Sequence, residues 1–216
     1  ASMTRVYALA HSATNDPAFG LSIAEFVHPT SLNALGFSLL ASNTLESFCR
    51  RVVRYFRLVT TNAQCQMERT ASEGRLVMVP TIDREQYYPQ DAWMGTLVRF
   101  IREIYEPDYA PLAVCLRRPR PREKVQQFER FFRTDVQYGC DQNRLVFTLR
   151  DMDTELPAGN TELARRNDEV VMGLLARMDR DDVIARVRAL LVEQLPSGQC
   201  DKEKIAAQLN MSERSL

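Results

Sequence analysis

Five residues in the first half of the chain have the side chains that a small-molecule site needs. Tryptophan and tyrosine rings can line a cavity, and an arginine among them can anchor a polar group of the ligand. These residues lie near expected turns between strands and helices and are Arg54, Tyr55, Tyr87, Tyr88 and Trp93. The same residue types also fit a hydrophobic core in which Tyr55 and Trp93 are simply buried. A binding pocket is therefore one prediction for this set, and core packing is the other.

Catalytic and metal chemistry have little material in this sequence. It contains two histidines and five cysteines, and the cysteines form no C-x-x-C pair. This spacing argues against a zinc site or a disulfide framework and favours reduced thiols. Cys115 and Cys140 could be reactive, although buried structural cysteines are commoner. The signatures of serine hydrolases, P-loop proteins, dinucleotide-binding enzymes and zinc proteases are absent, so we predict no enzyme, no cofactor and no metal site.

The spacing of apolar residues predicts an α+β fold in which a mixed sheet is covered by helices. Helical spacing is expected over residues 4–13, 16–27, 32–41, 45–59, 90–105 and 125–132. Alternation predicts strands at residues 64–70, 76–82, 112–116, 136–138 and 144–149. Thr44 is expected to cap the helix with the clearest apolar stripe. Turns at residues 72–74 and 139–143 predict two hairpins, the second of which closes the domain.

The segment after the last strand predicts a loop and then a long helix. Asn160 or Thr161 can cap this helix, and the charged run at residues 179–182 interrupts its apolar stripe. Pro196-Ser197-Gly198 is expected to end it. We place a domain boundary near Asp179, which gives one domain over residues 1–178 and a second, all-α segment over residues 179–216.

The last twelve residues predict a helix, a tight turn and the opening of a second helix. Ile205, Ala206 and Leu209 share one helical face, residues 210–211 form the turn, and Ser212 has the position of an N-cap. Two short helices joined in this way form the DNA-binding helix-turn-helix, whose second helix enters the major groove. That second helix breaks off almost at its start, and its first residues are Ser212, Glu213, Arg214 and Ser215.

The C-terminal residues resemble the AraC/XylS family of bacterial transcription regulators, whose first helix-turn-helix contains a stretch like IA..L.MS.R.L. Earlier segments are similar to the arabinose-binding-type, non-cupin N-terminal domain of one branch of that family. They are Asp16 to Leu21, Leu35 to Phe37, Thr44-Leu45 with Arg54-Tyr55, residues 136–147, and Leu156-Pro157. The resemblance implies a sensor domain over residues 1–178 that binds a small-molecule effector and dimerises. It also implies that residues 179–216 are a DNA-binding domain truncated inside its first helix-turn-helix.

The resemblance further implies partners and a location. The partners are DNA, an effector and a second copy of the chain, with RNA polymerase as a further one, and the location is cytoplasmic. No apolar run reaches the roughly eighteen residues that cross a membrane. The 28 basic and 28 acidic residues cancel, so this chain alone should bind DNA weakly. The alternative is a free-standing small-molecule-binding module or an enzyme with an unrelated helical tail.

A basic cluster at residues 117–133 is a further candidate for a binding surface. Seven arginines and lysines alternate there with phenylalanines, a composition that nucleic-acid surfaces share. Glu123 and Glu129 dilute the charge, and Pro119 and Pro121 break any continuous basic helix. We therefore expect a solvated loop and helix edge. An interface with the DNA-binding domain or with RNA polymerase, and a site for an anionic ligand, are the alternatives.

Overall fold

The structure is a computed structural model that describes residues 3–81, 87–194, 201–212 and 214. The backbone divides into two compact units, Ala1–Val171 and Met172–Leu216. Each unit is described by itself. The predicted boundary near Asp179 separates a sensor domain from a DNA-binding domain, and this boundary stays a prediction.

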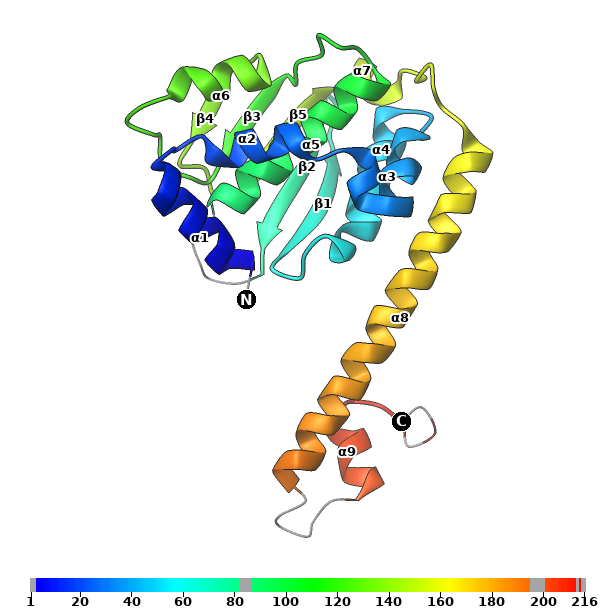
Figure 1. Ribbon diagram of the computed structural model, residues 1–216. Helices are drawn as coiled ribbons and strands as arrows, with labels where there is room; N and C mark the ends of the chain where they lie inside the picture. The colour runs from blue at the N-terminus through cyan, green and yellow to red at the C-terminus, as the bar shows by residue number, and fades with distance from the viewer. Residues whose placement is uncertain (1–2, 82–86, 195–200, 213, 215–216) are drawn as a thin grey trace. The chain divides into compact units, whose positions relative to one another are not determined.

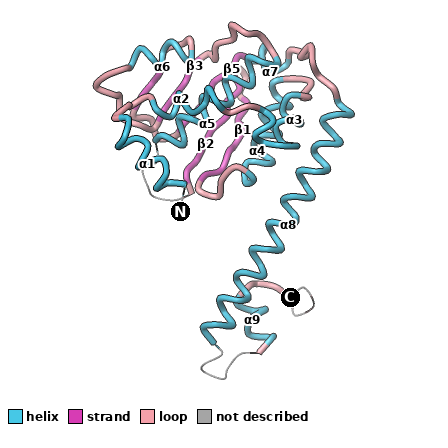
Figure 2. The backbone as a smooth tube through the Cα atoms, in the orientation of Figure 1, coloured by secondary structure: helices cyan, strands magenta, loops and turns pink. Residues whose placement is uncertain are grey.

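A five-stranded sheet forms the centre of the first unit (Figures 1 and 2). Its strands lie in the order β1-β2-β5-β3-β4, and they are β1 (Ala63–Arg69), β2 (Glu73–Pro80), β5 (Asn143–Thr148), β3 (Ala113–Leu116) and β4 (Val136–Tyr138). Strands β3 and β4 are parallel, and the other neighbours are antiparallel. With the helices packed around it, this mixed sheet confirms the predicted α+β class.

The two predicted hairpins had different outcomes. Strands β1 and β2 pair as expected, with Arg69 opposite Gly74 next to the turn. The closing hairpin is wrong, because β3 lies between β4 and β5 and pairs with both. Val114 and Leu116 of β3 are fully buried, whereas Gln137 of β4 is exposed. A strand that is buried on both faces belongs inside a sheet, and a short strand with a polar face belongs at its edge.

The helices of the first unit largely follow the predicted spans. They are α1 (Met3–Thr14), α2 (Phe19–Phe26), the 3₁₀ turn η1 (Pro29–Leu32), α3 (Asn33–Leu40), α4 (Leu45–Tyr55), the 3₁₀ turn η2 (Phe56–Leu58), α5 (Tyr87–Ile104), α6 (Val125–Phe132) and α7 (Leu149–Asp153). Helix α2 packs along α5, α5 contacts β5, and α4 lies beside β1 (Figure 1). Helix α7 replaces the end of the last predicted strand.

Helix α4 begins and ends for identifiable reasons. The Thr44 hydroxyl accepts a hydrogen bond from Ser47 N at 3.0 Å, which confirms the predicted cap. Such a cap stabilises a protein by about 1 kcal/mol. The apolar stripe of α4 is buried down to Tyr55, which is fully inaccessible. The helix then tightens into η2, so Phe56 continues the stripe with a different backbone geometry.

Helices α8 (Thr161–Gln194) and α9 (Lys202–Gln208) complete the described chain. Asn160 Oδ1 accepts from Leu163 N at 2.9 Å, as predicted for the start of α8. The charged run at residues 179–182 does not interrupt the helix, because exposed charges suit a solvated helical face as well as a break. The predicted end of this helix, Pro196-Ser197-Gly198, lies outside the described residues.

The second unit contains the predicted short helix and turn. The Asp201 carboxylate accepts from Lys204 N at 2.7 Å and caps α9. Ile205, Ala206 and Leu209 are buried, and Asn210 takes a left-handed conformation with φ 53° that ends the helix. Of the predicted second helix, Glu213 and Ser215 lie outside the described residues. Across the part of the chain that is described, no helix is both long and apolar enough to cross a membrane.

Candidate functional site

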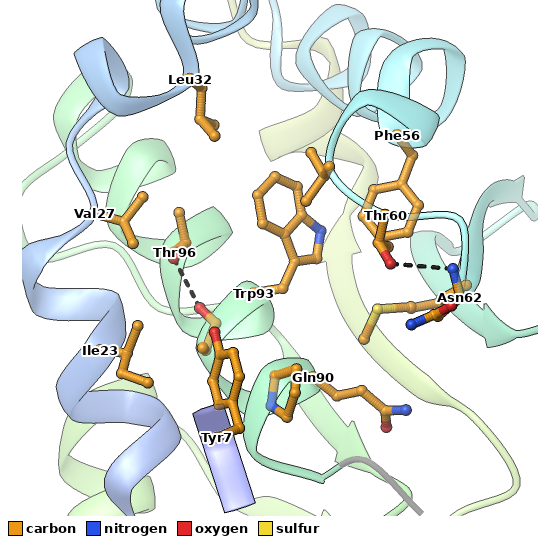
Figure 3. A pocket seen from close by; sticks show the side chains of 15 residues that line it. Tyr7, Ile23, Val27, Leu32, Phe56, Thr60, Asn62, Gln90, Trp93 and Thr96 are labelled. Carbon is orange, nitrogen blue, oxygen red and sulfur yellow. Dashed lines mark hydrogen bonds between the residues drawn. The ribbon is translucent and has the colours of Figure 1, made fainter. Parts of the chain in front are cut away.

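A pocket of about 300 Å³ opens in the first unit between helices α2 and α5 and the ends of strands β1 and β2 (Figure 3). Helix α1, the two 3₁₀ turns and the segment after η2 complete its wall. The lining residues are Tyr7, Ile23, Val27, Leu32, Phe56, Val59, Thr60, Asn62, Ala63, Met78, Pro89, Gln90, Ala92, Trp93 and Thr96. Because these residues come from many separate segments, only the folded unit forms the pocket.

Two aromatic rings form a firm wall of this pocket. The ring centroids of Phe56 and Trp93 lie 5.5 Å apart, with an angle of 53° between the ring planes. The Trp93 indole N–H is buried and makes no hydrogen bond of normal geometry within the described residues. It interacts with the Cys65 thiol, which is a weak acceptor. The faces of the two rings, rather than their polar atoms, are what this wall offers to a bound molecule.

Most of the polar groups in the wall are already engaged by the protein. Gln90 Oε1 accepts from Asn143 Nδ2 at 2.7 Å. The Thr96 hydroxyl donates to the Ala92 carbonyl at 2.8 Å, and Thr60 Oγ1 accepts from Asn62 N at 3.1 Å (Figure 3). Burial raises the pKa of the Tyr7 hydroxyl, so this group stays protonated and can donate to a ligand.

On a different face of α5, a buried ion pair holds the fold together. Arg118 donates to Asp91 Oδ2 at 2.5 Å and to the Pro17 carbonyl at 2.7 Å. Both side chains are buried, and the guanidinium lies 4.8 Å from the centre of the Phe128 ring. Burial raises the pKa of Asp91, although the neighbouring guanidinium opposes that rise. Asp91 and Arg118 are each other's counter-charge, and with the Pro17 carbonyl they connect α5, the segment before α2 and the segment after β3. The Arg118 Nε is buried without a hydrogen-bond partner among the described residues.

The first turns of α8 are held against α3 and α4. The Ser38 hydroxyl donates to Asp168 Oδ1, and Arg51 Nε donates to the same oxygen at 3.3 Å. Burial raises the pKa of the Tyr55 hydroxyl, and the negative charge of Asp168 adds to the rise. Val171 of α8 is fully buried. Three residues from two helices therefore converge on one carboxylate of α8.

The chain just before α8 is also held in place. Leu156 N donates to the Asn43 carbonyl at 2.8 Å, and Asn160 N donates to the Ala41 carbonyl at 3.0 Å. Asn43 Nδ2 donates to the Thr161 hydroxyl at 2.6 Å. The exit from the sheet thus follows the loop between α3 and α4, which fixes where α8 begins.

Comparison with known proteins decides the family. Residues 1–156 match the family model described as the arabinose-binding domain of AraC transcription regulators, at its N-terminal position. The chain belongs to this family. Members of the family are parts of transcription regulators rather than enzymes.

A solved structure shares the fold of this AraC-family chain. The crystal structure of the transcriptional regulator CdpR from Pseudomonas aeruginosa is similar with a TM-score of 0.59 at 16% sequence identity. The similarity covers 90% of this chain and 64% of CdpR, so this chain spans less than two thirds of the length of that regulator. No curated protein matches the chain.

The arabinose-binding domain brings only some of the five predicted ligand residues together. Trp93 lines the pocket. Tyr55 is buried in α4, and the Arg54 guanidinium lies 5.3 Å from the centre of its ring. Arg54 itself lines a neighbouring hollow formed by residues 53–65, which shares Phe56, Thr60 and Ala63 with the pocket. Tyr88 lies at the start of α5, where the Arg118 guanidinium is 5.8 Å from its ring, and Tyr87 begins the same helix.

Several lining residues were not among the predicted site residues. Phe56, Met78 and Val59 belong to patterns that indicate only a buried stripe or strand, and Tyr7 and Thr96 have no distinctive spacing. These residues belong to the candidate site only because tertiary packing brings them close to Trp93, and their spacing in the sequence does not show this. Of the predicted DNA-contacting residues, Ser212 and Arg214 are described and have no helical structure.

The thiols of this domain are mostly buried. Burial raises the pKa of Cys49 and of Cys65 far above its usual range, so both stay protonated and unreactive. Cys115 is buried as well, with its pKa raised mainly by desolvation, and Cys140 is half-buried. Among the described residues, no group of His, Cys, Asp and Glu side chains could hold a metal ion.

Proposed function

We propose that this chain is the sensory region of a DNA-binding transcriptional regulator and that the pocket beside Trp93 receives its small-molecule effector. One observation supports this best. The pocket wall residue Phe56 directly follows Tyr55, the last residue of the helix that holds Asp168 of α8. The pocket and the base of α8 are therefore connected through a single short segment of the first unit.

The proposed signal runs through packed side chains. A ligand against Phe56 and Trp93 changes the position of η2, and η2 continues from α4 without a loop. Helix α4 supplies Arg51, one of the two donors to Asp168. An effector can act only if it binds two arrangements of the domain with different affinity. In this proposal the two arrangements differ in how Asp168 is held.

The second unit is the proposed start of the DNA-binding module. Helix α9 is its first helix, Asn210 lies in the turn, and Ser212, Glu213, Arg214 and Ser215 open the recognition helix. The capped helix and its left-handed turn support this assignment. We place the boundary of the module near Asp179. DNA binding then requires the complete module, because the 28 basic and 28 acidic residues of this chain give no net positive charge.

Two copies of the chain complete the proposal. A homodimer brings two DNA-binding modules together and raises their effective local concentration, so a change in dimer geometry alters DNA occupancy. We place the regulator in the cytoplasm, where it acts together with RNA polymerase. The measured mass of the chain in light scattering at high micromolar concentration tests this part. A monomer at that concentration would contradict it.

The coupling is tested with the full-length gene product in a reporter strain. Transcription from the promoters that the regulator occupies is measured during growth on a panel of amino acids, sugars, signalling metabolites and neutral aromatic or aliphatic compounds. We expect at least one compound to change transcription through the wild-type protein. Val27→Phe, which fills the pocket, and Asp168→Asn, which removes the charge at the base of α8, should abolish that response.

Two controls make the reporter experiment specific. Glu169→Gln changes an exposed carboxylate of the same helix that pairs with Arg165, so it should leave the response intact. Thermal shifts with the responding compound should persist in Asp168→Asn and disappear in Val27→Phe. A full response in both Val27→Phe and Asp168→Asn would overturn the proposed function.

A further inference from the structure

We propose that the molecule bound in this pocket is a neutral, mainly apolar compound of about a dozen non-hydrogen atoms, and not a sugar or an ionised metabolite. This inference rests on the proposed function, since it concerns the ligand of the same pocket. The proposed ligand differs in chemistry from arabinose, the sugar after which the family is named.

The charge content of the described wall disfavours an ionised ligand. Every lining residue that the structure describes is uncharged, and eight of them are the aliphatic or proline side chains of Ile23, Val27, Leu32, Val59, Ala63, Met78, Pro89 and Ala92. An ion that leaves water without a counter-charge loses several kcal/mol or more. The carboxylate of Asp91, next to Gln90 in sequence, is occupied by Arg118.

The hydrogen-bonding capacity of the wall is too small for a sugar. A pentose has a polar oxygen on every carbon, and each buried hydroxyl without a partner costs about 1–3 kcal/mol. The Gln90 carbonyl, the Thr96 hydroxyl and the Thr60 hydroxyl already bind other parts of the protein. What the wall can still offer are the Tyr7 hydroxyl, the Asn62 side chain, the Gln90 amide N–H groups and the O–H of Thr60, whose oxygen only accepts within the protein. These suit one or two polar atoms at the end of a ligand.

The rings and the volume define the body of the ligand. Phe56 and Trp93 present flat apolar faces, which pack well against an aromatic ring or an alkyl chain. A dry cavity of about 150 Å³ is known to hold benzene. The pocket here is twice that volume, at about 300 Å³, and therefore has room for about a dozen non-hydrogen atoms. A carbonyl or hydroxyl at one end would satisfy the remaining donors.

The sequence supplies a direct probe, because Trp93 is the only tryptophan of the chain. Its fluorescence therefore reports on the pocket wall. We would titrate the protein at neutral pH with two matched pairs, acetophenone against benzoate and octanol against octanoate, and with L-arabinose. Within each pair the body is similar in size and the charge differs. Calorimetry on the same samples checks that the fluorescence change reflects binding.

We expect saturable binding of acetophenone or octanol, with benzoate, octanoate and L-arabinose at least tenfold weaker. Val27→Phe should abolish the change in Trp93 fluorescence. Phe26→Val, at an exposed neighbour outside the pocket, should leave it intact. Binding of L-arabinose or a carboxylate as tightly as the neutral probes would overturn the inference, and so would failure of both neutral probes to bind.

These outcomes are separable from failure of the proposed function. Tight binding of arabinose to the wild-type protein, lost in Val27→Phe, would refute the neutral ligand and keep a sensory pocket. Conversely, neutral probes that bind as expected in a protein whose reporter output ignores Val27→Phe and Asp168→Asn would refute the sensory role alone.

Discussion

Helix α5 presents two contrasting environments from adjacent residues. Gln90, Ala92, Trp93 and Thr96 line a pocket whose described wall has no charged side chain, whereas Asp91 between them points into a buried ion pair with Arg118. The two charges of this pair face each other inside the protein. The described pocket wall is mainly apolar and leaves space next to two rings. The two environments differ in charge: a buried carboxylate is paired inside the domain, whereas the described wall of the proposed ligand site has no charged side chain.

The largest loss of stability is expected when the buried ion pair is broken. Asp91→Ala leaves the Arg118 guanidinium buried without its counter-charge, and the loss of one partner of a buried pair costs about 3–5 kcal/mol. Urea denaturation measures the change in the free energy of unfolding. Asp108→Asn, at the exposed pair with Arg133, is the control and should cost less than about 1 kcal/mol. Equal effects of the two substitutions would show that burial of the pair is unimportant.

A smaller effect is expected on the pocket side. Trp93→Ala removes a large ring, but the ring already faces a cavity on one side, so we expect a loss of roughly 2 kcal/mol, below the usual 3–5 for a fully packed ring. Acetophenone binding, followed by calorimetry, should be lost as well. Phe128→Leu, at the ring beneath Arg118, is the matched variant that should lower stability and retain binding. Retention of binding in Trp93→Ala would mean that Trp93 is only a core residue.

The smallest loss of stability is expected for a substitution in the pocket that keeps the shape of the side chain. Thr96→Val removes a pocket hydroxyl that serves only its own helix, so the free energy of unfolding should change by less than about 1 kcal/mol and octanol should bind as tightly as before. Asp91→Asn keeps its shape too, yet it removes the charge opposite Arg118 and should cost more. A strong loss of octanol binding in Thr96→Val would indicate a polar ligand site.

Local features of this fold could be predicted from the sequence. The cap at Thr44 depends on two residues three apart, and the β1–β2 hairpin depends on a short turn at residues 70–73, next to Gly74. The C-terminal helix that buries Ile205 and Leu209 is equally local. In each case the residues that decide the structure are neighbours along the chain, so their spacing is informative.

Long-range features could not be predicted in the same way. The hairpin of β4 and β5 was predicted from the turn at residues 139–143. This turn does not show that β3, which is buried on both faces, takes the place between these two strands. Arg118 was expected in a solvated basic cluster, because its partner Asp91 lies 27 positions earlier. The pocket combines residues from Tyr7 to Thr96, and of its wall only Trp93 was selected from the sequence as a candidate.

Hydrogen exchange at the base of α8 tests directly whether ligand binding in the pocket changes how this helix is held. Exchange of the backbone amides of residues 161–171 would be followed by mass spectrometry in the free full-length protein and in the protein saturated with the compound to which the reporter responds. The account predicts a changed exchange rate in this segment of the wild-type protein and no such change in Asp168→Asn. Ligand saturation that leaves residues 161–171 unchanged in the wild-type protein would contradict it.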